Sequence, residues 1–191
     1  NADNRSGELD SLLAADNAPG PLGIIDLRNE VEPIAGLEPA TYSPRGYHLV
    51  DSGNPNGITV PAAGRVRVQD EGSQLAALML SAVKVTAKSE QWLDMCAAPG
   101  GKSAVLAWAA ETEGAHLVSN ESNATRVPLL KTSLAPWTNV TITNKDGRDF
   151  GTQGEKFSRI LVDAPCTGLG ALRRRPEARW RKTPADVAQI G

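Results

Sequence analysis

The 191-residue sequence has few cysteines, few histidines and no long hydrophobic run. Cys96 and Cys166 are the only cysteines, which argues against a disulfide framework and favours reduced, functional thiols. His48 and His116 are the only histidines, so no histidine-rich metal site is expected. No apolar run reaches the roughly 18 residues of a membrane span, and no signal peptide follows Asn1. These absences predict a soluble cytoplasmic protein without a metal or a membrane partner.

Length and composition predict a globular protein with an uneven distribution of charge. A chain of 20.1 kDa with 40% hydrophobic residues can form one full core, or one domain and part of another. Residues 1–64 contain three arginines and nine acidic residues, a net charge of −6, whereas residues 65–191 contain 17 basic and 13 acidic residues, a net charge of +4. Neither property indicates an oligomeric state.

Much of the positive charge lies in one run near the C-terminus. Residues 173–182 contain six cations and one tryptophan, including Arg173, Arg174, Arg175, Arg179 and Trp180. Such a run suits a phosphate backbone, with the indole ring stacking on a base. Composition leaves a solvated basic loop as the alternative interpretation.

The sequence divides near Gly64. Residues 1–64 are rich in glycine, proline, asparagine and aspartate, with one short helical pattern at residues 9–13 and an apolar stretch at residues 22–27. This segment is predicted to be either a small α+β unit or a partly ordered linker. Residues 65–191 are predicted to form the second domain.

From Val66 onward, helical and strand patterns alternate. Such alternation predicts βαβ units and a Rossmann-like α/β fold with a parallel sheet. The predicted helices are residues 74–85, 103–110 and 124–134, and the predicted strands are residues 91–95, 116–119, 140–143 and 159–162.

The loop from Asp94 to Lys102 joins a predicted strand to a predicted helix. In open α/β folds such loops bind ligands at the carboxyl edge of the sheet, and glycines there allow a close backbone approach. Three ligand classes fit: a nucleoside triphosphate, a dinucleotide and S-adenosylmethionine. Cys96 stands where a P-loop needs its first glycine, Pro99 removes an amide, and G-x-G-x-x-G is absent. S-adenosylmethionine therefore fits best.

Acidic residues follow the later predicted strands and support this choice. Glu121 is placed to accept both ribose hydroxyls, and Asp146 is placed to accept from the adenine amino group. Each acid alone is better explained as a solvated loop residue. Their occurrence after successive strands weakens that explanation, because the carboxyl ends of parallel strands meet at one edge.

Residues from Val66 to about Ile190 resemble the Sun/Fmu family of RNA cytosine-carbon-5 methyltransferases, and especially its bacterial 16S rRNA methyltransferase B (RsmB-like) members. The resemblance implies a class I S-adenosylmethionine-dependent methyltransferase fold, ribosomal RNA as the substrate, and a small RNA-binding subdomain before Gly64. Glu121 departs from the aspartate usual in the family. The matching segments are residues 68–74, 94–102, 146–148 and 163–168, and the basic run with Pro176 and Trp180. The implied cofactor-binding residues are Cys96, Ala97, Ala98, Pro99, Gly100, Gly101, Lys102, Glu121, Asp146 and Asp163.

The resemblance also changes the interpretation of Cys166. Taken alone, this cysteine is the obvious nucleophile for carbon 6 of cytosine. In the family, the equivalent cysteine assists product release, Asp163 contacts the base, and the attacking cysteine belongs to a later Thr-Cys pair. No Thr-Cys pair occurs in this sequence. We therefore expect a truncated domain that binds the cofactor but lacks the nucleophile and the C-terminal strands; an RNA-binding module without activity is the alternative. A helix-capping Asp163 and a buried Cys166 are the non-catalytic interpretation.

Overall fold

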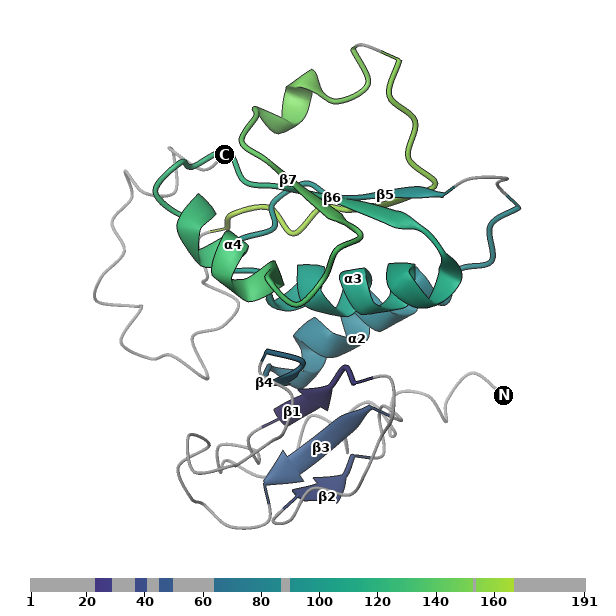
Figure 1. Ribbon diagram of the computed structural model, residues 1–191, viewed down its shortest axis with the longest axis vertical. Helices are drawn as coiled ribbons and strands as arrows, with labels where there is room; N and C mark the ends of the chain where they lie inside the picture. The colour runs from purple at the N-terminus through teal and green to yellow at the C-terminus, as the bar shows by residue number, and fades with distance from the viewer. Residues whose placement is uncertain are drawn as a thin grey trace, which may run out of the picture.

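The computed structural model describes residues 23–28, 37–40, 45–49, 64–86, 90–152 and 154–166 (Figure 1). These residues form two four-stranded sheets, and helices α2 and α3 lie between them (Figure 1). The predicted RNA-binding residues Arg173, Arg174, Arg175, Arg179 and Trp180 lie outside the described residues.

The first sheet is antiparallel and has the strand order β2-β3-β1-β4. Its central strand β1 is buried along its whole length, because β3 and β4 flank it on either side. The last strand, β4, follows the predicted boundary at Gly64, so the sheet extends beyond that boundary. The strands are β1 (Gly23–Asp26), β2 (Leu37–Pro39), β3 (Gly46–Leu49) and β4 (Val66–Val68).

The second sheet is parallel and has the strand order β7-β6-β5-β8. Helix α3 joins β5 to β6 and helix α4 joins β6 to β7, which confirms the predicted Rossmann-like α/β fold. The strands are β5 (Gln91–Asp94), β6 (His116–Asn120), β7 (Val140–Thr143) and β8 (Arg159–Leu161), and the helices are α2 (Glu71–Ser81), α3 (Gly101–Glu113) and α4 (Val127–Leu134).

Helix α3 forms the centre of the core. It packs against α2, α4 and strand β6, and small side chains let these elements approach closely. Trp92 and Leu117 of the second sheet belong to the same hydrophobic cluster, and both are fully buried. The fully or nearly buried residues of α3 are Ser103, Ala104, Val105, Leu106, Ala107, Ala109 and Ala110.

The helix boundaries differ from the predicted ones. Helix α2 begins at Glu71 rather than at residue 74, and an acidic residue in the first turn stabilises a helix start. It ends at Ser81, whose hydroxyl donates to the Leu78 carbonyl at 2.8 Å. Helix α4 begins at Val127 rather than at residue 124, because residues 124–126 form a turn. Strand β7 has the predicted bounds.

Candidate functional site

The carboxyl ends of the four parallel strands meet at one edge of the second sheet. The strand order places the loop after β5 between the loop after β6 and the loop after β8. Glu121 follows β6, Asp146 follows β7 and Asp163 follows β8. The fold therefore brings the acidic residues to the edge that holds the loop Asp94–Lys102, hereafter the cofactor loop.

Gly100 sets the shape of the cofactor loop. Its φ of 107° is a left-handed conformation that favours glycine, and it caps the N-terminus of α3. A Cβ atom at Gly100 would overlap the side chain of Ser133 and lie 3.3 Å from Leu130 Cδ1. The Ala98–Pro99 peptide bond is cis. Gly100 is thus required both by its backbone conformation and by its close contact with α4.

The cofactor loop is held to its neighbours by hydrogen bonds to its main-chain amide and carbonyl groups. The Ala97 amide donates to the Asn120 carbonyl at 2.8 Å. The guanidinium of Arg126 donates to the Ala98 carbonyl at 2.5 Å. Asn120 also donates to the carbonyls of Met95 and Lys145, at 3.1 and 3.0 Å. The loops after β5, β6 and β7 therefore form one connected unit.

Asp94 is a buried carboxyl at the start of this loop. It is 1% exposed, and its Oδ2 accepts from Ser103 Oγ at 2.6 Å. Burial raises the pKa of Asp94 to about 6, although the Ser103 hydroxyl and the Cys96 amide oppose that rise. Sequence reasoning placed Asp94 in the loop but not among the site residues. The signal was an acid that ends an apolar strand.

Lys102 connects the cofactor loop to the loop after β8. Its ammonium Nζ lies 2.7 Å from Asp163 Oδ2 and 3.2 Å from Ser73 Oγ. The Asp163 side chain is 56% exposed, whereas that of Lys102 is only 22% exposed. The predicted site residues Lys102 and Asp163 are thus in direct contact, with the carboxylate facing solvent.

Glu121 is buried and oriented by two partners. Its Oε1 accepts from the Asn123 amide at 2.8 Å, and its Oε2 lies 3.3 Å from Arg126 Nη1. The Asn144 side chain donates to the Glu121 carbonyl at 2.5 Å. Sequence reasoning missed Arg126, which contacts both Glu121 and the cofactor loop. A basic residue five positions after the acid was the available signal.

Asp146 lies on a more exposed part of the same edge. It caps the short helix η2 (Gly147–Asp149) by accepting from the Arg148 amide at 2.9 Å. Hydrogen bonds from Arg148 lower the pKa of Asp146 to about 2. A Cβ at Gly147 would lie 2.9 Å from Met95 Sδ, so this turn packs against the start of the cofactor loop.

The two cysteines occupy different environments. Burial raises the pKa of the Cys96 thiol, and the nearby carboxylates of Asp94, Glu121 and Asp163 raise it further. Cys96 is therefore held as a neutral thiol, which is a poor nucleophile. Cys166 is exposed, three residues after Asp163. The burial of Cys166 expected in the non-catalytic interpretation is therefore wrong, and the catalytic role of this cysteine stays a prediction.

Two absences apply to the part of the chain that the structure describes. There, no group of three or more histidine, cysteine or acidic side chains is placed to hold a metal ion. Nor does any described helix combine the length and the apolar character needed to cross a membrane.

The fold is that of a Rossmann-like methyltransferase. It is similar to a solved methyltransferase homolog protein from Pyrococcus horikoshii, with a TM-score of 0.67 and 21% identity over 88% of this chain and 55% of that one. It is also similar to NSun6 from Pyrococcus horikoshii, solved with SFG, with a TM-score of 0.59 and 23% identity over 78% of this chain and 39% of that one.

The chain belongs to the 16S rRNA methyltransferase RsmB/F family, whose model matches residues 82–191. It is 40% identical over 193 residues to a putative methyltransferase of Mycobacterium tuberculosis, covering 96% of this chain and 41% of that protein. It is 39% identical over 132 residues to the probable ribosomal RNA small subunit methyltransferase B of Bacillus subtilis, covering 66% of this chain and 28% of that protein. The chain thus spans less than half the length of these relatives. The match to the family model confirms the predicted family.

Proposed function

We propose that this chain is the cofactor-binding part of an enzyme that transfers a methyl group from S-adenosylmethionine to carbon 5 of a cytosine in RNA, with ribosomal RNA as the substrate. The contact between Lys102 and Asp163 carries this proposal, because it joins the cofactor loop to the strand end expected to meet the base. The names of relatives support the reaction, and they include a mouse 28S rRNA (cytosine-C(5))-methyltransferase that is 33% identical over 94% of this chain and 24% of that protein.

The residues of the edge fit S-adenosylmethionine. Gly100 lets the chain turn into α3, so that the free amide groups at the N-terminus of this helix lie at the edge. Glu121 presents an oriented carboxylate to ribose hydroxyls, and Asp146 remains ionised under its hydrogen bonds from Arg148. A solved structure of similar fold contains SFG, an analogue of this cofactor. When bound, S-adenosylmethionine supplies an electrophilic methyl group.

Asp163 and Lys102 are proposed to act on the base. The exposed carboxylate of Asp163 is suited to accept from the polar edge of cytosine, and the Lys102 ammonium, 2.7 Å away, orients it. Addition of a thiolate to carbon 6 would make carbon 5 nucleophilic. Carbon 5 would then form a bond to the methyl group, whose bond to sulfur breaks and leaves S-adenosylhomocysteine. Removal of the carbon 5 proton and elimination of the thiolate from carbon 6 would then restore the ring as 5-methylcytosine.

The two thiols are proposed to differ in role. Cys96 is not assigned to attack, because its neutral form is favoured. Exposed Cys166 is proposed to assist breakdown of the adduct, and the family resemblance assigns attack to a cysteine of a Thr-Cys pair that this sequence lacks. The arginines of residues 173–182 and Trp180 remain the predicted contacts with an extruded base and its backbone.

Calorimetric titration of the 191-residue chain with S-adenosylmethionine tests the proposal. We expect saturable binding, and we expect Glu121→Gln to weaken it about tenfold because a ribose contact is lost. Glu155→Gln is the matched control, because Glu155 pairs with Lys145 rather than with the cofactor loop. No binding by the folded chain, shown by circular dichroism, would contradict the cofactor assignment and favour an RNA-binding module.

A further inference from the structure

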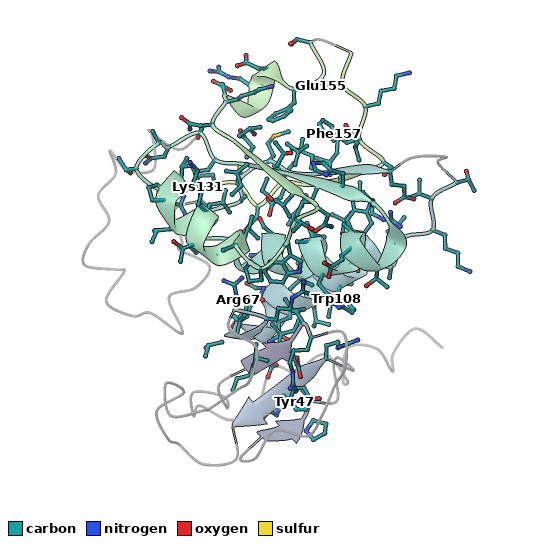
Figure 2. All side chains as sticks on the ribbon, viewed as in Figure 1. Tyr47, Arg67, Trp108, Lys131, Glu155 and Phe157 are labelled. Carbon is teal, nitrogen blue, oxygen red and sulfur yellow. The ribbon has the colours of Figure 1, made fainter. Side chains whose placement is uncertain are left out.

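Arg67 connects the first sheet to helix α4. It lies on β4, and its guanidinium donates to the Ser133 carbonyl at 3.0 Å through Nη1 and to the Ser133 hydroxyl through Nη2. Figure 2 shows Arg67 at the junction between the first sheet and the helices. Two hydrogen bonds from one guanidinium fix both the main chain and the side chain of Ser133.

Ser133 in turn contacts the residue that shapes the cofactor loop. Its Oγ and Cβ occupy the space where a Cβ atom of residue 100 would lie. Gly100 must keep a positive φ to begin α3, and its turn packs against the Ser133 side chain. A shift of Ser133 therefore changes the packing of this turn. Arg67 therefore reaches Gly100 through a single intermediate side chain.

The same segment of chain packs against the next glycine. The side-chain amide of Gln69, two residues after Arg67, is 3.6 Å from the position of a Cβ at Gly101. Gln69 is 8% exposed, and neither polar atom of its amide has a hydrogen-bond partner within the described part of the chain. Gln69 thus supports Gly101 by packing alone, whereas Arg67 supports Gly100 through directional bonds.

We propose that Arg67 is a positioning residue for the cofactor loop, and that through Ser133 it makes the affinity of this loop for S-adenosylmethionine depend on the first sheet. The ligand in this inference rests on the proposed function. The role of Arg67 is indirect, because its guanidinium bonds to α4 rather than to the loop itself. The loop and the sheet are then coupled through three residues in contact.

Arg65 provides a matched control two residues away. Its guanidinium lies 2.8 Å from Glu111 Oε2, donates to the Pro136 carbonyl at 3.2 Å and stacks 5.3 Å from the centre of the Trp137 ring. Arg65 joins the first sheet to α3 and to the segment after α4. Arg67 likewise joins the first sheet to α4. However, Arg65 does not bond to Ser133, the residue that packs on Gly100.

Amide hydrogen exchange on the cofactor-free 191-residue chain tests the positioning role without any ligand. We expect Arg67→Met to speed exchange at the amides of residues 97, 98, 100 and 101 about tenfold, because the loop loses its support and opens locally more often. Arg65→Met should change the exchange of these residues by less than about twofold, even if it lowers global stability. Equal exchange in the two variants would overturn the proposal.

Titration with S-adenosylmethionine tests the consequence for binding. Arg67→Met should weaken binding about tenfold and Arg65→Met by less than about twofold, whereas Arg67→Lys should restore part of the loss. In a Ser133→Ala background, Arg67→Met should cost clearly less than it does alone; an equal cost in both backgrounds would overturn the proposal. Failure of the wild-type chain to bind would contradict the proposed function, while the exchange comparison would still decide the role of Arg67.

Discussion

Asp26 and Asp94 end the central strands of the two sheets, and their surroundings differ. Both carboxyl groups are buried, with exposures of 0% and 1%. Asp26 receives the Arg28 guanidinium, with Nη2 at 2.7 Å from Oδ2, as well as the Arg28 amide at 3.0 Å. Asp94 receives a hydroxyl from Ser103, and no cation of the described residues forms an ion pair with it.

We propose that this difference separates a structural acid from an acid of the candidate site. A buried carboxylate costs free energy unless a partner compensates it, and Asp26 has that partner within its own strand end. Asp94 has no cationic partner among the described residues, and burial raises its pKa. Incomplete compensation of this kind gathers at functional sites, where a ligand rather than the fold supplies the remaining contacts.

The largest expected effect comes from breaking the compensated pair. Asp26→Asn should lower the free energy of unfolding by about 3–5 kcal/mol, because it removes the buried carboxylate that pairs with the Arg28 guanidinium. Chemical denaturation followed by tryptophan fluorescence measures the change. Substituting both residues, as Asp26→Asn with Arg28→Met, should recover part of the loss, and no recovery would show that the charge pair is not the cause.

The contrast between the two sheets also explains how much of the fold the sequence predicted. Strand β7 is a local run of β-branched residues, Val140–Thr143, and its bounds were predicted correctly. The first sheet pairs Ile24 with Tyr47 and with Val68, so its strands come from segments far apart in the chain. Local periodicity carries no information about such pairings, and only a small α+β unit or a linker was predicted there.

The candidate site divides in the same way. The acids at strand ends were readable, because they follow strands that local patterns reveal. The contact of Ser133 with Gly100 and the ion pair of Arg126 with Glu121 were not, because each depends on how α4 packs against the sheet. Sequence spacing predicts which edge of the sheet a residue occupies, but it does not predict which helix packs against that residue.

Gly100 tests whether the site region depends on such packing. Gly100→Ala should lower the free energy of unfolding by about 2–4 kcal/mol, because the methyl group both strains a positive φ and overlaps Ser133. Gly114 is the control, since its φ is 68° but its Cβ would meet nothing within 4 Å. Gly114→Ala should therefore cost only about 1 kcal/mol. Similar costs from denaturant unfolding would mean that packing against α4 contributes little.

The smallest expected effect is a gain in stability at the uncompensated acid. Because the pKa of Asp94 rises from 3.8 to about 6 on folding, the native state binds more protons than the unfolded state between these values. The contribution of Asp94 to stability therefore falls as the pH rises from about 4 to about 6, and it is constant above that range.

Asp94→Asn removes this titration while keeping a polar group beside Ser103. We expect the variant to be more stable than the wild type by about 1–2 kcal/mol above pH 6, after allowance for a weaker bond to Ser103, with the difference vanishing near pH 4. Thermal unfolding measured from pH 4 to pH 8 follows the difference. Asp26→Asn is the opposite case, since it removes the carboxylate that pairs with Arg28 and should destabilise the protein. A stability difference between the Asp94→Asn variant and the wild type that stays constant from pH 4 to pH 8 would show that Asp94 stays ionised. The two strand ends would then differ in hydrogen bonding rather than in charge.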